Sequence, residues 1–261
     1  MIVLPVDQAR RDYGPLLEAK KAGNEGVFLY LPPGESHTMT LESGKPVYLF
    51  VGKGAKLSWD GASPVTSVTV EEGGMFSHVK RGEGIFDVTL KKRARSEVIS
   101  AVILDEGEVS QHLTAHLVGE EGFASFQSVH RLSEKARSSI GIEVRHIAPN
   151  CRSHQHVKAV LADRSRLSFA GKIYVEKEAQ RTDAYQLSNV MLLGEHALAS
   201  TRPGLEIYAD DVKASHGSTI GQLSEEELFY LQTRGLSLAE AKEMVIRGFC
   251  DDILRLCCDN A

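Results

Sequence analysis

The central part of this chain is a long succession of short β-strand patterns. From Val27 to Leu223, short runs rich in Val, Ile, Leu, Phe and Thr alternate with gaps that hold Gly, Pro, Asn or Asp. The spacing is about 10 residues per strand and turn, as in all-β folds. No amphipathic helical pattern interrupts the stretch, which disfavours parallel strands joined by helices. A sandwich, a barrel or a β-solenoid remains, and no strict short repeat decides between them.

Several strands carry small or polar residues on both faces. The runs SSIGIEV and FASFQSV are examples. A solenoid tolerates such strands, because each coil buries only its inward positions and stacks on its neighbours.

Helices are predicted at both ends, which gives three parts: an N-terminal helical segment over 1–26, a β core over 27–223 and a helical region over 224–261. The C-terminal signals are the clearest, since SEEE and SLAE are two capping boxes in succession. The last helix carries one apolar stripe, formed by Leu238, Ala241, Val245, Phe249, Ile253 and Leu256. We expect part of this stripe to close the open end of the β region and the rest to meet a partner protein.

Composition excludes several classes of function. The net charge of −5 gives no attraction to nucleic acid or anionic lipid. No apolar run approaches the roughly 20 residues that span a bilayer, and the N-terminus lacks the pattern of a secretory signal. The four cysteines, Cys151, Cys250, Cys257 and Cys258, are expected to be free thiols in a cytoplasmic protein. No phosphate-binding loop, nucleophile elbow or Rossmann glycine pattern occurs.

His154 and His156 are a candidate metal pair. On a strand, residues i and i+2 share a face, so both imidazoles could bind one ion. This spacing is similar to the cupin pattern, but Lys158 stands where a carboxylate ligand would be expected. Two solvated or hydrogen-bonded histidines on a strand are therefore the favoured interpretation, and a cupin-like metal-dependent enzyme is kept as the alternative.

Three further candidates are weaker. His112 and His116 share a strand face but lie far apart. Asp210 and Asp211 could bind a hard cation, although adjacent carboxylates on an extended segment point to opposite sides and Asp is a common turn former. His216 precedes a glycine in a polar segment, and a neutral imidazole is a competent ligand for iron.

The segment from about residue 153 to 253 carries a long ordered series of motifs: FAGKIYV, QRTDAYQ, MLLGEHA, TRPGLEIYADDVKASHG and ELFYLQTRGLS. This series resembles the C-terminal core of the SufB/SufD family of iron–sulfur cluster assembly scaffolds. The resemblance implies a mainly β fold, a right-handed parallel β-helix followed by C-terminal helices. It also implies a non-enzymatic scaffold that pairs with a SufB-like paralogue, or with itself as a homodimer, and binds a SufC-like ATPase.

The resemblance also assigns residues. It places SufC docking on the C-terminal helices, with candidate residues Leu228, Phe229, Leu231, Leu238, Val245 and Phe249. It places His216 at the subunit interface as a cluster or metal ligand, where a transient iron–sulfur cluster forms. No cofactor is expected on the isolated chain.

Details are similar to SufD rather than SufB. Ser188 lies in the segment where SufB-like members have a cysteine, and His216-Gly217 replaces their His-Glu pair. Ala214 stands where SufD members often have a cysteine, so a thiolate from that position is excluded. Family members usually have a longer N-terminal part, so we expect a SufD-like chain with a shortened one. A carbohydrate-active β-helix ranks last, because Trp59 is the only tryptophan.

Overall fold

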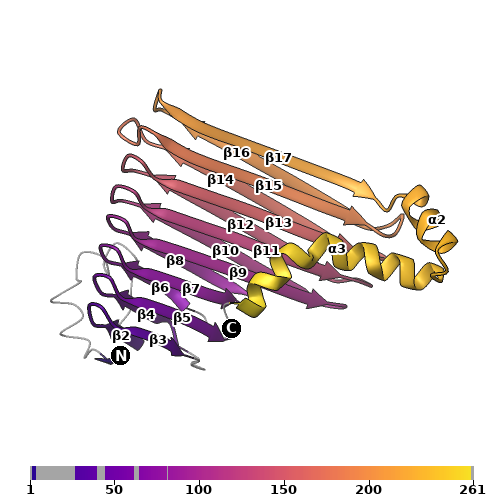
Figure 1. The fold of residues 1–261 in the computed structure, drawn as a ribbon, viewed down its shortest axis with the longest axis horizontal. Coiled ribbons are helices and arrows are strands. Elements are labelled where there is room, and N and C mark those ends of the chain that lie inside the picture. Colours follow the sequence, from indigo (N-terminus) through magenta and orange to yellow (C-terminus); the bar gives the residue numbers. More distant parts are fainter. Residues whose placement is uncertain (1, 4–26, 40–44, 62–64, 81, 260–261) are drawn as a thin grey trace.

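The protein is a flattened parallel β-solenoid with two helices at its C-terminal end (Figure 1). The computed structural model describes residues 2–3, 27–39, 45–61, 65–80 and 82–259. Strand β1 and the even-numbered strands form one sheet, in the order β1-β2-β4-β6-β8-β10-β12-β14-β16, and the odd-numbered strands from β3 to β17 form the other. From β2 onward every pairing is parallel, and only β1 joins β2 antiparallel. The predicted solenoid is thus confirmed. The predicted N-terminal helix lies outside the described residues.

The strands of the first sheet are β1 (Ile2–Val3), β2 (Val27–Leu31), β4 (Val47–Val51), β6 (Val65–Val70), β8 (Gly84–Leu90), β10 (Glu108–Leu117), β12 (Arg137–His146), β14 (Arg166–Val175) and β16 (Leu198–Ile207). Those of the second sheet are β3 (Ser36–Met39), β5 (Lys56–Gly61), β7 (Met75–Lys80), β9 (Arg95–Leu104), β11 (Phe123–Leu132), β13 (Arg152–Leu161), β15 (Thr182–Leu192) and β17 (Val212–Gln222). One strand in each sheet makes one coil.

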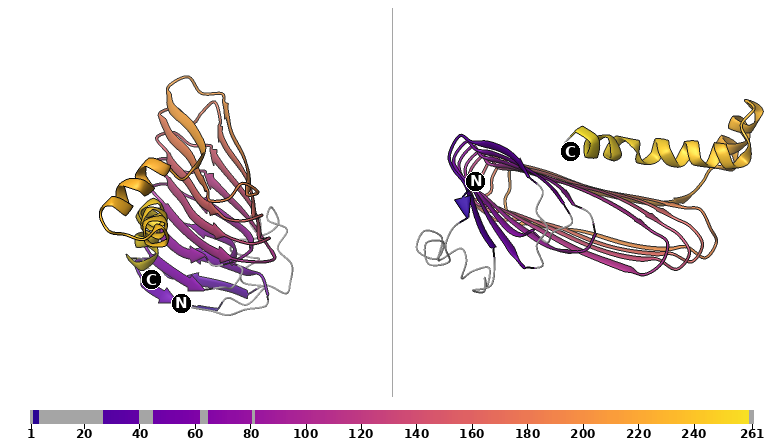
Figure 2. Two further views of the ribbon diagram at one scale, coloured as in Figure 1. Left: turned by 90° about the vertical axis from the view of Figure 1, so that its right-hand side faces the viewer. Right: turned by 90° about the horizontal axis from the view of Figure 1, so that it is seen from below.

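The coils widen along the chain. Ser36 of β3 pairs with Lys56, which is 20 residues later, whereas Ser110 of β10 pairs with Ser139, which is 29 residues later. Strand length rises accordingly, from six residues in β5 to ten in β10. Figure 2 shows the narrower indigo coils beside the wider orange ones. A change of period in mid-chain explains why no single repeat can be read from the sequence.

Where each coil before the last passes from the first sheet to the second, the turn contains a residue with a positive φ angle. Together these residues form a hydrogen-bonded ladder that joins successive coils. Each member donates its amide N–H to a carbonyl of the next coil, as Gly54 does to Glu72 O (2.9 Å) and Asn150 to Gln180 O (2.9 Å). The members of the ladder are Gly34, Gly54, Gly73, Arg93, Glu121, Asn150 and Arg181. Glycine is favoured at such a backbone position because it carries no Cβ, but the later coils use other residues. The repeat is therefore present in the backbone conformation, but the residue type at this position changes along the chain.

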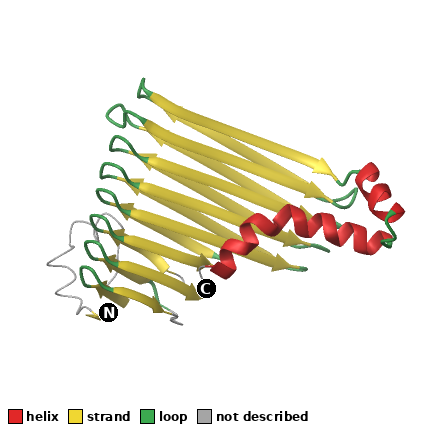
Figure 3. Cartoon of the chain, in the orientation of Figure 1, coloured by secondary structure: helices red, strands yellow, loops and turns green. Residues whose placement is uncertain are grey.

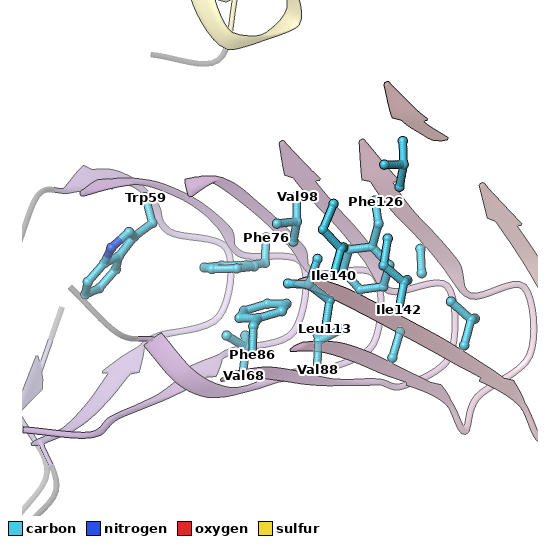
Figure 4. Packing of buried hydrophobic residues seen from close by; sticks show 14 of the residues in the cluster. Trp59, Val68, Phe76, Phe86, Val88, Val98, Leu113, Phe126, Ile140 and Ile142 are labelled. Carbon is cyan, nitrogen blue, oxygen red and sulfur yellow. The ribbon is translucent and has the colours of Figure 1, made fainter. Parts of the chain in front are cut away.

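The hydrophobic core lies between the two sheets. Inward side chains of the early coils are large and apolar, and Trp59, Phe76 and Phe86 are fully buried. Figure 4 shows these rings following one another along the interior toward Phe126. The rings of Phe76 and Phe86 lie 5.9 Å apart, each from a different sheet. Full burial of such a side chain contributes about 1.5–3 kcal/mol.

The C-terminal helices begin at the two predicted caps. In α2 (Glu225–Thr233), Ser224 Oγ accepts a hydrogen bond from the amide of Glu227. Before α3 (Leu238–Asp259), Ser237 Oγ accepts from the amide of Glu240, and the Glu240 carboxylate accepts from the amide of Ser237. This reciprocal pair is a complete capping box.

Helix α3 does not close the end of the solenoid, contrary to the expectation. It runs along the outer face of the second sheet (Figures 1 and 3). Its buried side chains Ile246, Cys250 and Ile253 pack against Val129 and Val160 of β11 and β13. Of the expected stripe, Ala241 and Ile253 are buried and Phe249 and Leu256 pack against the buried cluster, whereas Leu238 is 47% exposed. The prediction failed because an apolar stripe defines a buried face without identifying the surface that covers it. Among the described residues, no helix is long and apolar enough to cross a membrane.

Candidate functional site

The last coil leaves one end of the solenoid open. Strands β16 and β17 are the final strands of their sheets, so each presents one edge of backbone N–H and C=O groups that no strand among the described residues pairs (Figure 1, orange). We call this surface the open end. The apolar side chains of Leu198, Ile207 and Ile220 are 37% to 53% exposed there. A terminal coil without a cap is an incomplete structure, which a further set of strands would complete.

The residues of β17 whose side chains face the interior of the solenoid form the surface at the open end. Ala214, His216, Ser218 and Ile220 pair in register with Ala184, Gln186, Ser188 and Val190 of β15, whose side chains are buried in the interior. Thr201 Oγ1 of β16 and Ser218 Oγ lie 2.5 Å apart, which joins the two sheets of the last coil. His216 is exposed and lies in the inward column of the open end.

Two buried glutamines lie beneath His216. Gln186 is 2% exposed and pairs with His216 in the register of β15 and β17. Its Nε2 donates to Gln155 Oε1 (2.6 Å), and Gln155 Nε2 donates to the backbone carbonyl of Lys172 (3.3 Å). A methyl group on Gly171 of the opposite sheet would lie 1.9 Å from Gln186 Nε2, so this glycine leaves the space that the amide occupies.

The sequence did not identify either glutamine. In β15 the usual alternation is inverted, since Gln186 and Ser188 point inward while Tyr185 and Leu187 are exposed. Alternation alone therefore assigns the wrong face to this strand. The only sequence signal was that several strands were polar on both faces.

The other candidates in the last turn are structural. Ala214 stands in the same inward column as His216 and offers no ligand atom. Asp211 accepts the amide of Arg181 on its backbone carbonyl, and its own amide donates to Gln180 Oε1 (3.0 Å). Asp210 and Asp211 thus lie in the turn that begins β17, as turn formers.

His154 and His156 have separate partners on the outer face of the second sheet. The ring of His154 lies edge-on between Phe123 (5.8 Å) and Tyr185 (5.6 Å). His156 Nε2 lies 3.0 Å from Asn189 Oδ1, and burial lowers the pKa of His156. Within the described part of the chain, no three His, Cys, Asp or Glu side chains gather as a metal site.

Lys158 has a structural role that the cupin comparison missed. Its Nζ donates to Asp252 (2.7 Å) and to the backbone carbonyl of Phe249 (2.8 Å), which fastens α3 to β13. Arg131 adds a two-pronged pair with Glu243. Such bidentate contacts fix orientation as well as supplying energy.

The histidines at 112 and 116 also lie apart. The ring of His112 covers Gly141, where an added methyl group would lie 2.6 Å from Nδ1. His116 Nε2 lies 3.2 Å from Asp87 Oδ2. Neither arrangement brings the two imidazoles to one ion.

Both cysteines whose side chains are described are free and buried. Cys151 follows Asn150 in the turn ladder, at a position that Ala55 and Ala94 fill in earlier coils. Burial raises the pKa of Cys151 to about 11, so this thiol stays protonated at neutral pH. A protonated thiol is a poor metal ligand, so Cys151 does not supply a thiolate ligand beside His216.

The predicted docking residues divide between two environments. Leu228 is buried, whereas Phe229 is 69% exposed. Leu231 and Val245 line a hollow of about 520 Å³ between α2 and α3, together with Tyr230. Phe249 lies on the other side of α3, packed against the solenoid and over Lys158 Nζ at 5.1 Å. Phe249 therefore anchors the helix and is not part of the free surface.

The architecture defines a class of protein: a parallel β-solenoid with an uncapped final coil and a helical pair fixed to its side. The family model described as "SUF system FeS cluster assembly, SufBD core domain" matches residues 45–249. The chain therefore belongs to the SufB/SufD family, as its motifs predicted.

The relatives agree with a SufD-like member. The iron–sulfur cluster assembly protein SufD of Escherichia coli is 42% identical over 103 residues, which cover 40% of this chain and 24% of SufD. Protein ABCI7, chloroplastic, of Arabidopsis thaliana is 28% identical over 214 residues, which cover 78% of this chain and 45% of that protein. The SufBD family protein ycf24 of Galdieria sulphuraria is 28% identical over 175 residues, which cover 65% and 79%.

Proposed function

We propose that the chain is a SufD-like scaffold of the SUF machinery for iron–sulfur cluster assembly, and that it acts without catalysing a reaction of its own. In this proposal its open end pairs with a SufB-like paralogue or with a second copy of itself. Its C-terminal helices bind a SufC-like ATPase, and the cluster forms transiently between the paired chains. The expected compartment is the cytoplasm.

The observation that carries the proposal is the open end with His216 in its inward column. Unpaired strand edges and exposed apolar side chains favour the addition of strands from another chain. Because His216 points from the last coil toward the space that such strands would enclose, pairing would place it between two subunits. An imidazole there is suited to bind iron.

The helices support the second part of the proposal. The buried side of α3 and the pairs at Lys158 and Arg131 hold the helical pair against the solenoid. Exposed Phe229, Tyr230 and Met244 leave an apolar surface on the far side. A rigid base with a free apolar face is suited to bind a partner that moves.

The test is co-expression with a SufB-like chain and a SufC-like ATPase, followed by purification of the complex. We expect iron and acid-labile sulfide to co-purify, and His216→Ala to lower both by roughly tenfold, the scale seen when groups that orient a metal ligand are lost. His112→Ala removes an exposed histidine from the outer face of the first sheet and is the matched control.

Two results would count against the proposal. If no complex forms, the assignment as a SUF scaffold fails. If the His216→Ala complex keeps its full cluster content, His216 is an ordinary surface residue and the ligand must come from elsewhere.

A further inference from the structure

The two buried glutamines beneath His216 form a series of hydrogen bonds in which the direction of each bond is fixed. The backbone carbonyl of Lys172 can only accept, so Gln155 must present its NH₂ group there and its Oε1 to the next coil. Gln186 must then present its own NH₂ group to Gln155 Oε1. A backbone oxygen thus determines which way both amides face.

This series of hydrogen bonds ends in an acceptor atom that receives no hydrogen bond. Gln186 Oε1 is fully buried and has no hydrogen-bond partner among the described residues. A buried acceptor without a donor costs about 1–3 kcal/mol, so the site favours any donor that can reach it. Neighbouring strands lie about 4.8 Å apart, and the residue that pairs with Gln186 across that distance is His216.

We propose that Gln186 is a positioning residue for His216: its Oε1 accepts a hydrogen bond from one ring N–H and so leaves the other ring nitrogen, with its lone pair, facing the open end. A neutral imidazole has one donor and one acceptor nitrogen, and a fixed acceptor beneath the ring selects the tautomer. Metal-binding histidines commonly donate their second nitrogen to a carbonyl in this way. This inference rests on the proposed role of His216 as a ligand.

The geometry of the opposite sheet supports the assignment. Gly171 leaves space for the Gln186 amide, and also for the ring of Phe169, since a methyl group there would lie 1.9 Å from Gln186 Nε2 and 2.6 Å from Phe169 Cζ. Ser188 is the next inward residue of β15, and its Oγ also has no partner among the described residues. Ser188 pairs with Ser218, however, whose hydroxyl is already bonded to Thr201.

The test is the tautomer ratio of His216 in the full chain, measured from long-range ¹H–¹⁵N spectra above pH 8. The signal is assigned by its loss in His216→Ala. His196, an exposed histidine in the turn after β15, is the internal reference. We expect the ratio at His216 to differ from that at His196 by about fivefold, which corresponds to the ~1 kcal/mol of a typical hydrogen bond.

Variants separate the hydrogen bond from packing. Gln186→Leu should return the ratio to that of His196, and Gln155→Leu should weaken the bias, because Gln186 can then reverse its amide. Gln186→Glu keeps an acceptor oxygen and should keep the bias. Ser188→Ala removes a neighbouring buried hydroxyl outside the amide chain and should change nothing.

The inference is overturned if the wild-type ratio equals that of His196, or if Gln186→Leu leaves it unchanged. An equal change in Ser188→Ala would also overturn it, because packing alone would then be the cause. The measurement needs no partner and no cluster. A biased tautomer together with undiminished cluster yield in His216→Ala would therefore support the positioning role and reject the ligand role.

Discussion

Two histidines inside the solenoid are held in the neutral form. Burial lowers the pKa of His130 to about 3 and that of His146 to about 4. Each has one hydrogen-bond partner, Ser138 for His130 (3.0 Å) and Ser153 for His146 (2.8 Å). The other ring nitrogen of each lies buried without a partner among the described residues. Charging either ring would place an unpaired cation in the interior.

This burial predicts acid sensitivity. The pKa of His130 in the folded state lies below the unfolded value of 6.5, so the unfolded chain binds more protons between about pH 3 and 6.5. The stability contributed by the neutral ring is full above pH 6.5 and falls as the pH drops through this window, by at most about 1.4 kcal/mol per pH unit for each histidine. His130→Gln should flatten that slope in urea unfolding at pH 7.5, 6 and 5.

His196→Gln is the control, since it makes the same substitution at an exposed position in the turn after β15. An equal slope in the wild type and His130→Gln would show that other groups account for the acid sensitivity.

Single residues were the least predictable part of the molecule. The family motif points to His216, whose role as a ligand stays a prediction, but nothing in the sequence points to Gln155 or Gln186. Whether a strand residue points inward depends on the register of the whole stack, and β15 buries its polar side. The two histidines at 154 and 156 share a face as predicted, but the ring of His154 packs edge-on against Tyr185, whereas His156 is hydrogen-bonded to Asn189.

At the scale of elements, the C-terminal helices show what local signals can and cannot determine. Both caps were predicted because they depend on residues three apart. The surface that α3 covers was not, because it depends on contacts with β11 and β13, far away in the chain. From the sequence, Lys158 only argues against a metal site, whereas in the structure its Nζ lies 2.7 Å from Asp252 Oδ2 of α3.

The exposed side of the helical pair gives a prediction for ATPase binding. Phe229 is 69% exposed, and a buried aromatic side chain contributes about 1.5–3 kcal/mol. Phe229→Asp should therefore weaken binding of a SufC-like ATPase by about 10- to 100-fold in a titration of purified proteins. Val245→Asp, in the hollow between the helices, should act in the same direction.

Ile85→Asp is the matched control, because Ile85 is 63% exposed on the outer face of the first sheet, far from the helices in sequence. Unchanged ATPase binding in both helix variants, with the fold intact by circular dichroism, would remove the docking assignment.

At the scale of the whole molecule, the architecture was predicted and its dimensions were not. The absence of an amphipathic helical pattern disfavoured helix-linked sheets, and the family resemblance selected a solenoid. The increase from 20 to 29 residues per coil was not visible, because the left-handed turn position changes from glycine to other residues along the ladder.

The open end predicts self-association when no paralogue is present. Its exposed apolar side chains and unpaired edges should drive two copies together. Sedimentation at micromolar concentration should show a dimer for the wild type and a monomer for Ile220→Lys, since a lysine at this inward position would be buried on pairing.

Ile103→Lys tests the same change at an isoleucine that is 77% exposed on β9. It should remain dimeric. A monomeric wild type, or a dimer that survives Ile220→Lys, would mean that the open end is not the self-association surface.

The widening of the coils has a consequence for partner choice. The strands at the open end, β16 and β17, have 10 and 11 residues, whereas β3 and β5 near the other end have four and six. A partner chain with short terminal strands could pair with only part of the edges of β16 and β17. It would leave the remaining backbone N–H and C=O groups of these edges exposed to water. We therefore expect strand length itself to act as a molecular ruler, which admits partners of equal breadth before any individual side chain is compared.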